Sequence, residues 1–472
     1  MSERPGTVRA ALVGCALALG AGAPAAQVVR PDSLPPLPDR IALYGDTLSV
    51  RFDPPDLAPP AGSVRLSLAE AVRAALSENP AFAIVELEAR RAENDATRGN
   101  AGMLPTLDAS ASVAGDWAAS ILGGDSAGAS TSGATRLGAG VALGYTLFDG
   151  GRRGATLRRL REEARRAGLT VEAEADAVAF AVISAYLEVI RQEALVGALV
   201  EAAAVSEDRL RIENAEVSIG TAADIDAALA LSDLNADRAA IVRQGVALTQ
   251  ARTVLGELLD LPRPEAVEAT DSLAVPPAPD LAALEARAAE GNSRLRALEV
   301  GESVAREAMA EVRAEYSPRV ALSAGAGVSA FDRGFLPAGD PEFGPDVSYG
   351  VTASIPIFDG GDRRRRTENA RIRLEQAQMA TADGRSAVRA RAARLVAAAR
   401  GFRQLAELEV QNRAVARQNV RVALAQFQLG FITPIDLRQV QLALLDVETR
   451  LVNAIAAAVV AEAELRLLGG QQ

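Results

Sequence analysis

The sequence predicts a mainly α-helical protein with a small β part, built from two internal repeats. Residues 144–153 (GYTLFDGGRR) recur as residues 354–363 (SIPIFDGGDR), and residues 217–226 (VSIGTAADID) recur as residues 427–436 (FQLGFITPID). Both pairs are separated by 210 positions. A shared offset across two separate motifs indicates a duplicated structural unit.

The amino terminus has the order of a secretory signal peptide, which we place at residues 1–26. Arg4 and Arg9 precede an apolar run, and small residues follow it, as at a cleavage site. Cys15 also stands at lipobox spacing, so acylation of this cysteine is an alternative. Only five residues lie between it and Arg9, however, which is few for the apolar core of a signal.

Proline-rich stretches mark the boundaries of the repeats. Residues 27–65 are predicted to form an extended, irregular N-terminal segment, and residues 263–279 a linker. The first repeat is therefore placed at residues 66–262 and the second at residues 280–472.

Each repeat opens with a predicted helix, at residues 66–102 and 280–316, that stops before a proline. Two strand-like segments follow. Their positions are 107–113 and 137–147 in the first repeat, and 320–328 and 347–357 in the second. Apolar residues alternate with Gly, Ser, Thr and other small residues, as expected for a strand with one apolar face. Such strands approach the ~9–11 residues that cross a bilayer, although a soluble sheet with one solvated face is the alternative. Four strands cannot close a barrel, so a membrane location requires several chains to pool their strands.

One very long helix is predicted after the strands of each repeat, at residues 152–218 and 363–429. Each range holds 67 residues without a proline, which as continuous helix would extend ~100 Å at ~1.5 Å per residue. Such helices suit coiled-coil or tubular packing rather than a compact domain. A tight turn at Gly220 or Gly430 and a returning helix complete each repeat. A soluble coiled-coil structural protein remains an alternative, although it leaves the strands and the signal peptide unexplained.

The turns have local structural explanations. Gly220 and Gly430 suit the left-handed residue that ends a helix, Thr221 with Asp224 resembles a capping box, and Thr433 precedes a proline suited to a first helical position. Asp226 and Asp436 are interpreted either as first-turn acids or as pore-lining residues. The strand-to-helix turns are interpreted as structural, and their residues are Phe148, Asp149, Gly150, Gly151, Phe358, Asp359, Gly360 and Gly361.

Composition excludes most enzyme chemistry. The chain has no His and no Lys, and Cys15 is its one cysteine. Imidazole or thiolate catalysis, imidazole zinc sites and Schiff-base chemistry are therefore not available, which leaves carboxylates as the one common catalytic option. The acids are scattered along helices, so a carboxylate-dependent hydrolase is a weak alternative. We predict no catalytic residue, no metal and no cofactor. A net charge of −11 argues against a nucleic-acid partner.

Taken together, these residues resemble the TolC family of outer-membrane efflux and secretion channels. The resemblance covers the duplicated helix–strand–strand–long helix–turn–helix unit, the Phe-Asp-Gly-Gly strand exit and the Gly-x5-Asp turn. It implies a homotrimer with a β-barrel in the outer membrane and a long α-helical barrel in the periplasm. It also implies three kinds of contact: outer-membrane lipid, a periplasmic adaptor (membrane fusion) protein and an inner-membrane transporter.

The same resemblance implies roles for the helical tips. The adaptor would dock on Ile219, Gly220, Thr221, Leu429, Gly430 and Phe431. The pore entrance would involve Asp226, Asp436, Phe427 and Gln439. Phe427 and Ile432 replace residues that form polar locks in some members, so we expect a more apolar closure here.

We therefore expect a passive outer-membrane exit channel of a tripartite efflux pump, which carries small molecules and is not an enzyme. The open alternatives within this class are type I protein secretion and metal-ion efflux.

Overall fold

The computed structural model describes residues 40–43, 46–49, 51–53, 55–121, 129–275, 277–332 and 342–470. The predicted signal peptide, with Cys15, lies outside these residues. The chain divides into two compact units, one made of Met1–Glu86, Thr170–Arg294 and Arg385–Gln472, the other of Leu87–Leu169 and Leu295–Gly384. We call them the tip unit and the strand unit.

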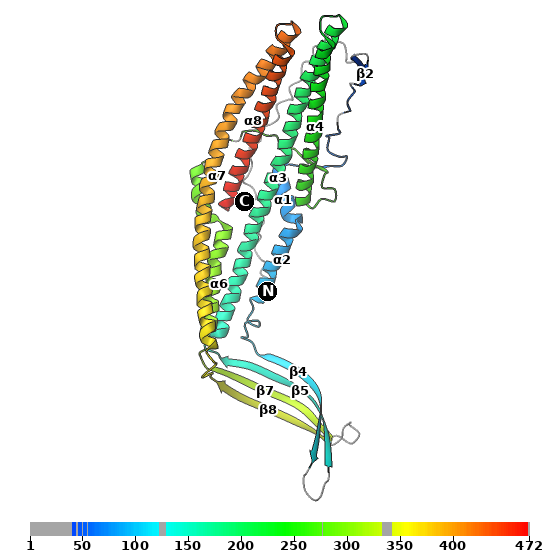
Figure 1. Cartoon of the computed structure of the whole chain (residues 1–472). Coiled ribbons are helices and arrows are strands. Elements are labelled where there is room, and N and C mark those ends of the chain that lie inside the picture. The colour runs from blue at the N-terminus through cyan, green and yellow to red at the C-terminus, as the bar shows by residue number, and fades with distance from the viewer. Residues whose placement is uncertain are drawn as a thin grey trace. The chain divides into compact units, whose positions relative to one another are not determined.

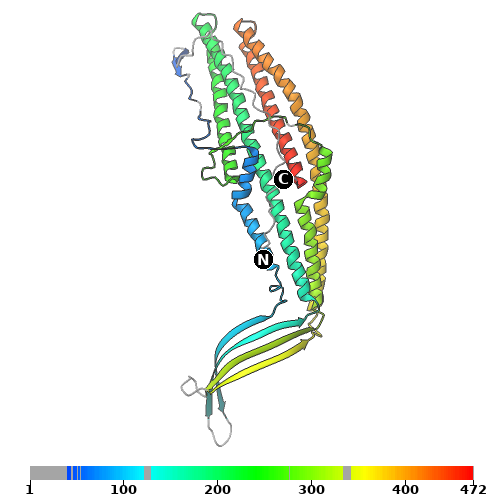
Figure 2. The same cartoon turned by 180° about the vertical axis from the view of Figure 1, so that it is seen from behind.

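The tip unit is built around two helical hairpins, α3 (Arg152–Ser218) with α4 (Asp224–Leu258) and α7 (Asp362–Gln428) with α8 (Pro434–Leu468), whose members lie side by side in both views (Figures 1 and 2). Its elements are β1 (Arg40–Leu43), β2 (Asp46–Ser49), β3 (Val64–Leu66), α1 (Leu68–Glu78), α4 (Asp224–Leu258), β6 (Val267–Ala269), α5 (Leu281–Gly291) and α8 (Pro434–Leu468). Elements that belong partly to each unit are α2 (Pro80–Asp95), α3 (Arg152–Ser218), α6 (Ser293–Ala314) and α7 (Asp362–Gln428).

The two long helices are confirmed. Both α3 and α7 contain 67 residues, α3 with the predicted bounds and α7 one residue earlier at each end. Their returning partners, α4 and α8, contain 35 residues each. None of the helices in the described part of the chain is both long enough and apolar enough to cross a membrane.

The single helices predicted at residues 66–102 and 280–316 are wrong, because each is divided in two. Asn79 separates α1 from α2, and Asn292 separates α5 from α6. The Asn79 side chain accepts from the backbone amide of Ala81 at 3.0 Å, while its amide donates to the carbonyl of Leu258 at 3.1 Å. Asn292 donates in the same way to Leu468 at 3.2 Å. Each break thus satisfies a free carbonyl at the end of a returning helix.

The proline-rich segments are less irregular than predicted. β1 pairs with β2, and β3 of the N-terminal segment pairs in parallel with β6 of the linker between the repeats. The Tyr186 hydroxyl of α3 lies 2.9 Å from the carbonyl of Leu66 and 2.9 Å from Asp271 Oδ2. Burial raises the pKa of Tyr186 to about 12. These strands have three or four residues, too few for an alternation to be recognised.

The strand unit contains a four-stranded antiparallel sheet in the order β4 (Thr106–Ile121), β5 (Ala129–Phe148), β7 (Arg319–Asp332) and β8 (Glu342–Ser354). The predicted strands are confirmed in place, but all four are longer than expected. The last ends at Ser354 rather than at residue 357, just before Pro356, which lacks a backbone donor.

The strand register separates two faces. One row across the sheet consists of Leu107, Leu143, Ala324 and Tyr349. The next row, on the opposite face, consists of Asp108, Ala142, Gly325 and Ser348. We call these the apolar face and the polar face. The predicted alternation is therefore confirmed in all four strands.

Candidate channel entrance at the helical tips

The turns at the two hairpin tips have the same backbone geometry. Gly220 and Gly430 have φ of +76° and +72°, a region that residues with a Cβ seldom adopt. The amide of Thr221 donates to the carbonyl of Glu216, and that of Phe431 to Gln426, each at 2.9 Å. This six-residue closure ends α3 and α7 and reverses the chain.

Asp226 and Asp436 lie in the first turns of the returning helices, each at the third helical position. Asp436 Oδ2 accepts from the Thr433 amide at 3.0 Å and from its hydroxyl at 2.6 Å, which completes a capping box. These hydrogen bonds hold the pKa of Asp436 below its usual range. In the first hairpin, Asp226 accepts from the amide of Ala223 at 3.2 Å. The box predicted from Thr221 and Asp224 is wrong, because the helix starts later and the Thr221 hydroxyl donates to Glu216 instead.

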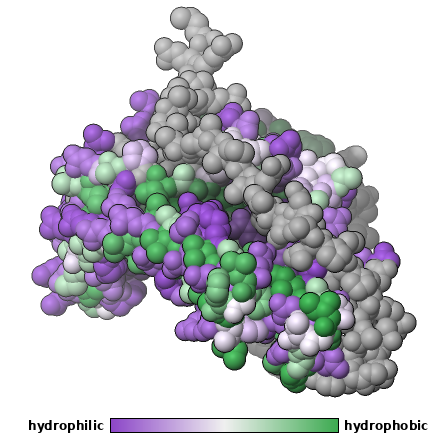
Figure 3. Space-filling view, turned by 90° about the horizontal axis from the view of Figure 1, so that it is seen from above, coloured by the Kyte–Doolittle hydropathy of each residue, from purple (hydrophilic) through white to green (hydrophobic). Residues whose placement is uncertain are grey.

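Exposed apolar side chains gather at both tips. Ile219 is 74% exposed, Leu429 69%, Phe431 76% and Ile435 77%. Seen from the tip end, hydrophobic atoms stand among hydrophilic ones (Figure 3). Large apolar groups at such exposure are typical of contact surfaces. The docking residues predicted from the sequence are thus accessible in the single chain.

The four residues predicted at the entrance have different surroundings. Gln439 and Asp436 are exposed, and Asp226 is half-buried. Phe427 is only 5% exposed and belongs to a cluster with Ala423, Leu437 and Ile212. Because Ile212 belongs to α3, Phe427 contributes to the contact between the two hairpins rather than to a free surface.

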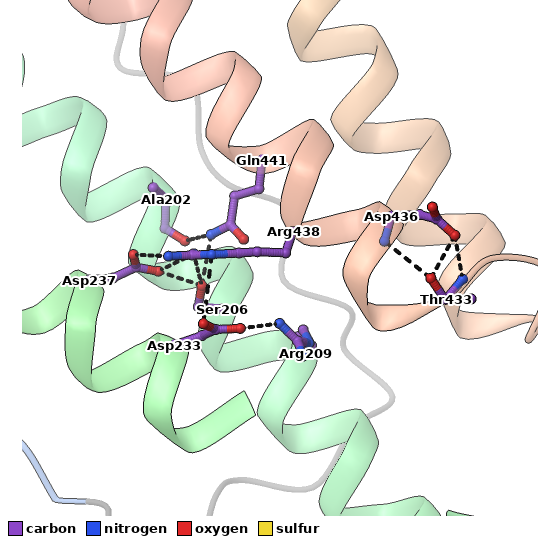
Figure 4. Close-up of polar contacts among 9 residues, drawn as sticks. All are labelled: Ala202, Ser206, Arg209, Asp233, Asp237, Thr433, Asp436, Arg438 and Gln441. Carbon is purple, nitrogen blue, oxygen red and sulfur yellow. Dashed lines mark hydrogen bonds and ion pairs between the residues drawn. The ribbon is translucent and has the colours of Figure 1, made fainter. Parts of the chain in front are cut away.

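A polar bridge also joins the two hairpins, centred on Arg438 of α8 (Figure 4). Its guanidinium donates to both carboxylate oxygens of Asp237 in α4, each at 2.8 Å. The Ser206 hydroxyl of α3 donates to Asp237 at 2.6 Å and accepts from Gln441 at 2.7 Å. Gln441 also donates to the carbonyl of Ala202. We call this group the Arg438 bridge.

The Arg438 bridge is shielded from water. Ser206, Asp237 and Gln441 are 2%, 7% and 3% exposed. The hydrogen bond to Asp237 raises the pKa of Arg438. Beside it, Arg209 donates to Asp233 at 2.6 Å. A bidentate arginine–carboxylate pair combines strength with fixed geometry.

The expected apolar closure refers to the entrance of an assembled channel and stays a prediction. Positions 427 and 432 gave no information about Arg438, six positions beyond Ile432. One feature of the sequence indicated the contact: Arg438 lies between Leu437 and Val440, on the side of α8 that otherwise carries packed apolar residues.

In the strand-to-helix turns, an aspartate caps the start of the following helix. Asp149 Oδ2 accepts from the amide and the guanidinium of Arg153, and Asp359 Oδ2 does the same with Arg363. Gly150, Gly151, Gly360 and Gly361 all have positive φ. Phe148 and Phe358 stand exposed beside the turns.

The family comparison identifies the chain. The model of the outer membrane efflux protein family matches residues 71–259 and 284–471. The chain belongs to this family. The protein is therefore located in the outer membrane, with its helical part in the periplasm. The family consists of channels. A soluble coiled-coil protein is thereby rejected.

Solved structures share the fold at low identity. A membrane protein from Pseudomonas aeruginosa is 19% identical with a TM-score of 0.72, over 89% of this chain and 98% of that one. The outer membrane protein VceC from Vibrio cholerae is 17% identical with a TM-score of 0.71, over 85% and 96%. The open MtrE outer membrane channel of Neisseria gonorrhoeae is 19% identical with a TM-score of 0.67, over 89% and 97%. Among curated proteins, none matches this sequence.

Proposed function

We propose that the chain assembles as a homotrimer and forms a passive exit duct for small molecules, which a periplasmic adaptor connects to an inner-membrane pump. The observation that carries assembly is the open sheet: β4 and β8 each pair on one side only in the described chain. Backbone groups in a bilayer need hydrogen-bond partners, so the free edges require neighbouring chains. Three copies of four strands give a twelve-stranded barrel.

The repeat symmetry supports the same assembly. A Cβ on Gly150 would lie 2.2 Å from Ser317, so α6 and its turn cover this glycine closely. A Cβ on the equivalent Gly360 would meet no atom of the described chain within 4 Å, apart from those of its two neighbours in sequence. In an assembled ring of repeats, the beginning of the neighbouring chain covers Gly360 in the way that α6 covers Gly150.

The proposed roles of the tips follow their chemistry. Ile219, Gly220 and Thr221 in one hairpin, and Leu429, Gly430 and Phe431 in the other, offer an accessible apolar turn for the adaptor. Asp226, Asp436 and Gln439 supply the polar groups of the entrance. Phe427 is buried and packs the two hairpins against each other.

Detergent-extracted protein is expected to have three times the mass of the mature chain, which is the 49.0 kDa of the full sequence less the signal peptide, and to form ion-conducting channels in planar bilayers. Light scattering coupled to size exclusion measures the mass after the detergent is subtracted. A well-behaved monomer in detergent-free buffer, or a trimer that never conducts, would contradict the proposal.

Replacing Asp436 with Asn is expected to weaken the cation preference of the reconstituted channel. Three carboxylates on a narrow ring attract cations, and Asn removes the charge while keeping a side-chain oxygen for the capping box. Because its pKa is lowered, Asp436 keeps its charge until the pH falls below the usual range of Asp, and the preference should disappear only there. Reversal potentials in a salt gradient measure the effect.

Asp383→Asn provides the control, because Asp383 is also exposed on a helix but belongs to the strand unit. An unchanged reversal potential in Asp436→Asn would leave Asp436 only its role at the helix start.

A further inference from the structure

A small cavity lies where the strand unit changes from helix to strand. It has a volume of about 350 Å³ and is lined by Gly150, Arg306, Met309, Ala310, Arg313 and Ser317. Gly150 follows the end of β5 by two residues, and Ser317 precedes β7 by two. The cavity is therefore next to the ends of two strands of the sheet.

The cavity has unneutralised positive charge. The exposed side chain of Arg313 makes no hydrogen bond or ion pair within the described chain, and the one partner of the Arg306 side chain there is Glu302 at 4.0 Å. The neighbouring acids of α6 are already paired: Glu307 with Arg158, and Glu311 with Arg159, each at 2.9 Å. An anion would find two available guanidinium groups and little repulsion.

Exposed aromatic residues place the cavity at the level of a membrane surface. Phe148, at the end of β5, is 50% exposed, and Tyr316, next to the cavity, is 48% exposed. A register shift at the end of β5 pairs Phe148 with Val320 and turns it to the apolar face. Aromatic side chains concentrate at the boundary between hydrocarbon and water. Because the chain is an outer-membrane protein, this boundary is the periplasmic one, beside the helices.

The cavity opens on the same side as the apolar face. The Thr106 hydroxyl of β4 donates to the carbonyl of Gly144, a polar-face residue of β5. The backbone N–H and C=O groups of polar-face residues in β5 therefore point toward β4. Those of apolar-face residues point toward β7. For L-amino acids, this places β7 and α6 to the right of β5 and α3, seen from the apolar face with the helices uppermost. In that view α6 runs downward, with Leu298 on its side toward α7 and Glu307 on its side toward α3. Arg306 and Arg313 lie between these two sides of α6, on the surface that faces the viewer. That surface is on the same side of the strand unit as the apolar face.

We propose that Arg306 and Arg313 bind the phosphodiester headgroup of an anionic phospholipid in the periplasmic leaflet. The apolar face and the aromatic residues hold the acyl chains beside the sheet, and the arginines contact the phosphate at the helical end of the sheet. Arginine suits this role, because its planar group donates to two phosphate oxygens at once. The protein thereby contacts lipid through charged side chains as well as through apolar ones.

The test is a titration of detergent-extracted protein with dioctanoyl phosphatidylglycerol, with bound lipid counted by native mass spectrometry. Phosphatidylglycerol is expected to bind more tightly than dioctanoyl phosphatidylcholine. Arg306→Gln with Arg313→Gln should weaken it by about 25-fold, at roughly fivefold per arginine removed. Arg306→Lys with Arg313→Lys keeps the charge and should retain most of the affinity.

The matched control is Arg243→Gln with Arg389→Gln, two exposed arginines of the tip unit, and it should bind as the parent does. Equal affinity for both lipids, or equal loss in both double variants, would overturn the proposal. So would inorganic phosphate that displaces the lipid at equal concentration, because the site would then recognise a free anion. These are binding measurements, so they stand apart from the conductance assays of the proposed channel.

Discussion

Val347→Arg is expected to remove most of the membrane-inserted protein. Val347 lies near the middle of β8, is 77% exposed in the single chain and shares its row on the apolar face with Ala326, Val141 and Ala109. An arginine on the lipid side near the bilayer midplane costs about 2–4 kcal/mol, and an oligomer of identical chains incurs this cost in every copy. Heat-resistant oligomer in outer-membrane fractions, measured on gels against total expressed chain, reports the effect.

The neighbouring Ser348→Arg is the matched control, because it introduces the same side chain on the polar face. We expect it to retain most of the oligomer. Gly144 would be a less suitable control, since any Cβ there would lie 3.0 Å from Thr106 Oγ1. Similar losses for Val347→Arg and Ser348→Arg would show that the two faces of the sheet do not differ as described.

Arg438→Ala is expected to destabilise the contact between the hairpins by about 3–5 kcal/mol, because it leaves the buried carboxylate of Asp237 without its cationic partner. The melting temperature of the extracted protein should fall, and the remaining channels should conduct more, since the tips are held together less firmly. Thermal unfolding and single-channel recording measure the two consequences.

Two further variants separate the bridge from general damage to α8. Gln439→Ala changes the adjacent, exposed residue and should alter stability by less than about 0.5 kcal/mol. Asp237→Asn combined with Arg438→Ala should cost less than the two single changes together, because the unpaired charge is removed. Additive losses would mean that the two side chains act independently, and unchanged conductance in a destabilised Arg438→Ala would restrict the Arg438 bridge to folding.

Periodic features could be recognised from the sequence because they depend on neighbours along the chain. The alternation at residues 137–147 predicted β5 and its two faces, and the proline-free stretches predicted α3 and α7. The shared offset of the motifs predicted equivalent turns, and Gly220 and Gly430 share the same positive φ. The divided helices at Asn79 and Asn292 were missed, although Pro80 was a visible signal for the first.

The sequence by itself determined the duplicated unit, the apolar face of the sheet and the reversal at each tip, since helix periodicity, strand alternation and glycine backbone freedom are local. Only the tertiary structure decided that Arg438 meets Asp237, 201 positions away, and that Phe427 packs on Ile212. It also decided that Arg306 and Arg313 line a cavity beside Gly150. Such contacts depend on which faces of separate elements meet, and that is fixed by packing across the whole chain rather than by any local pattern.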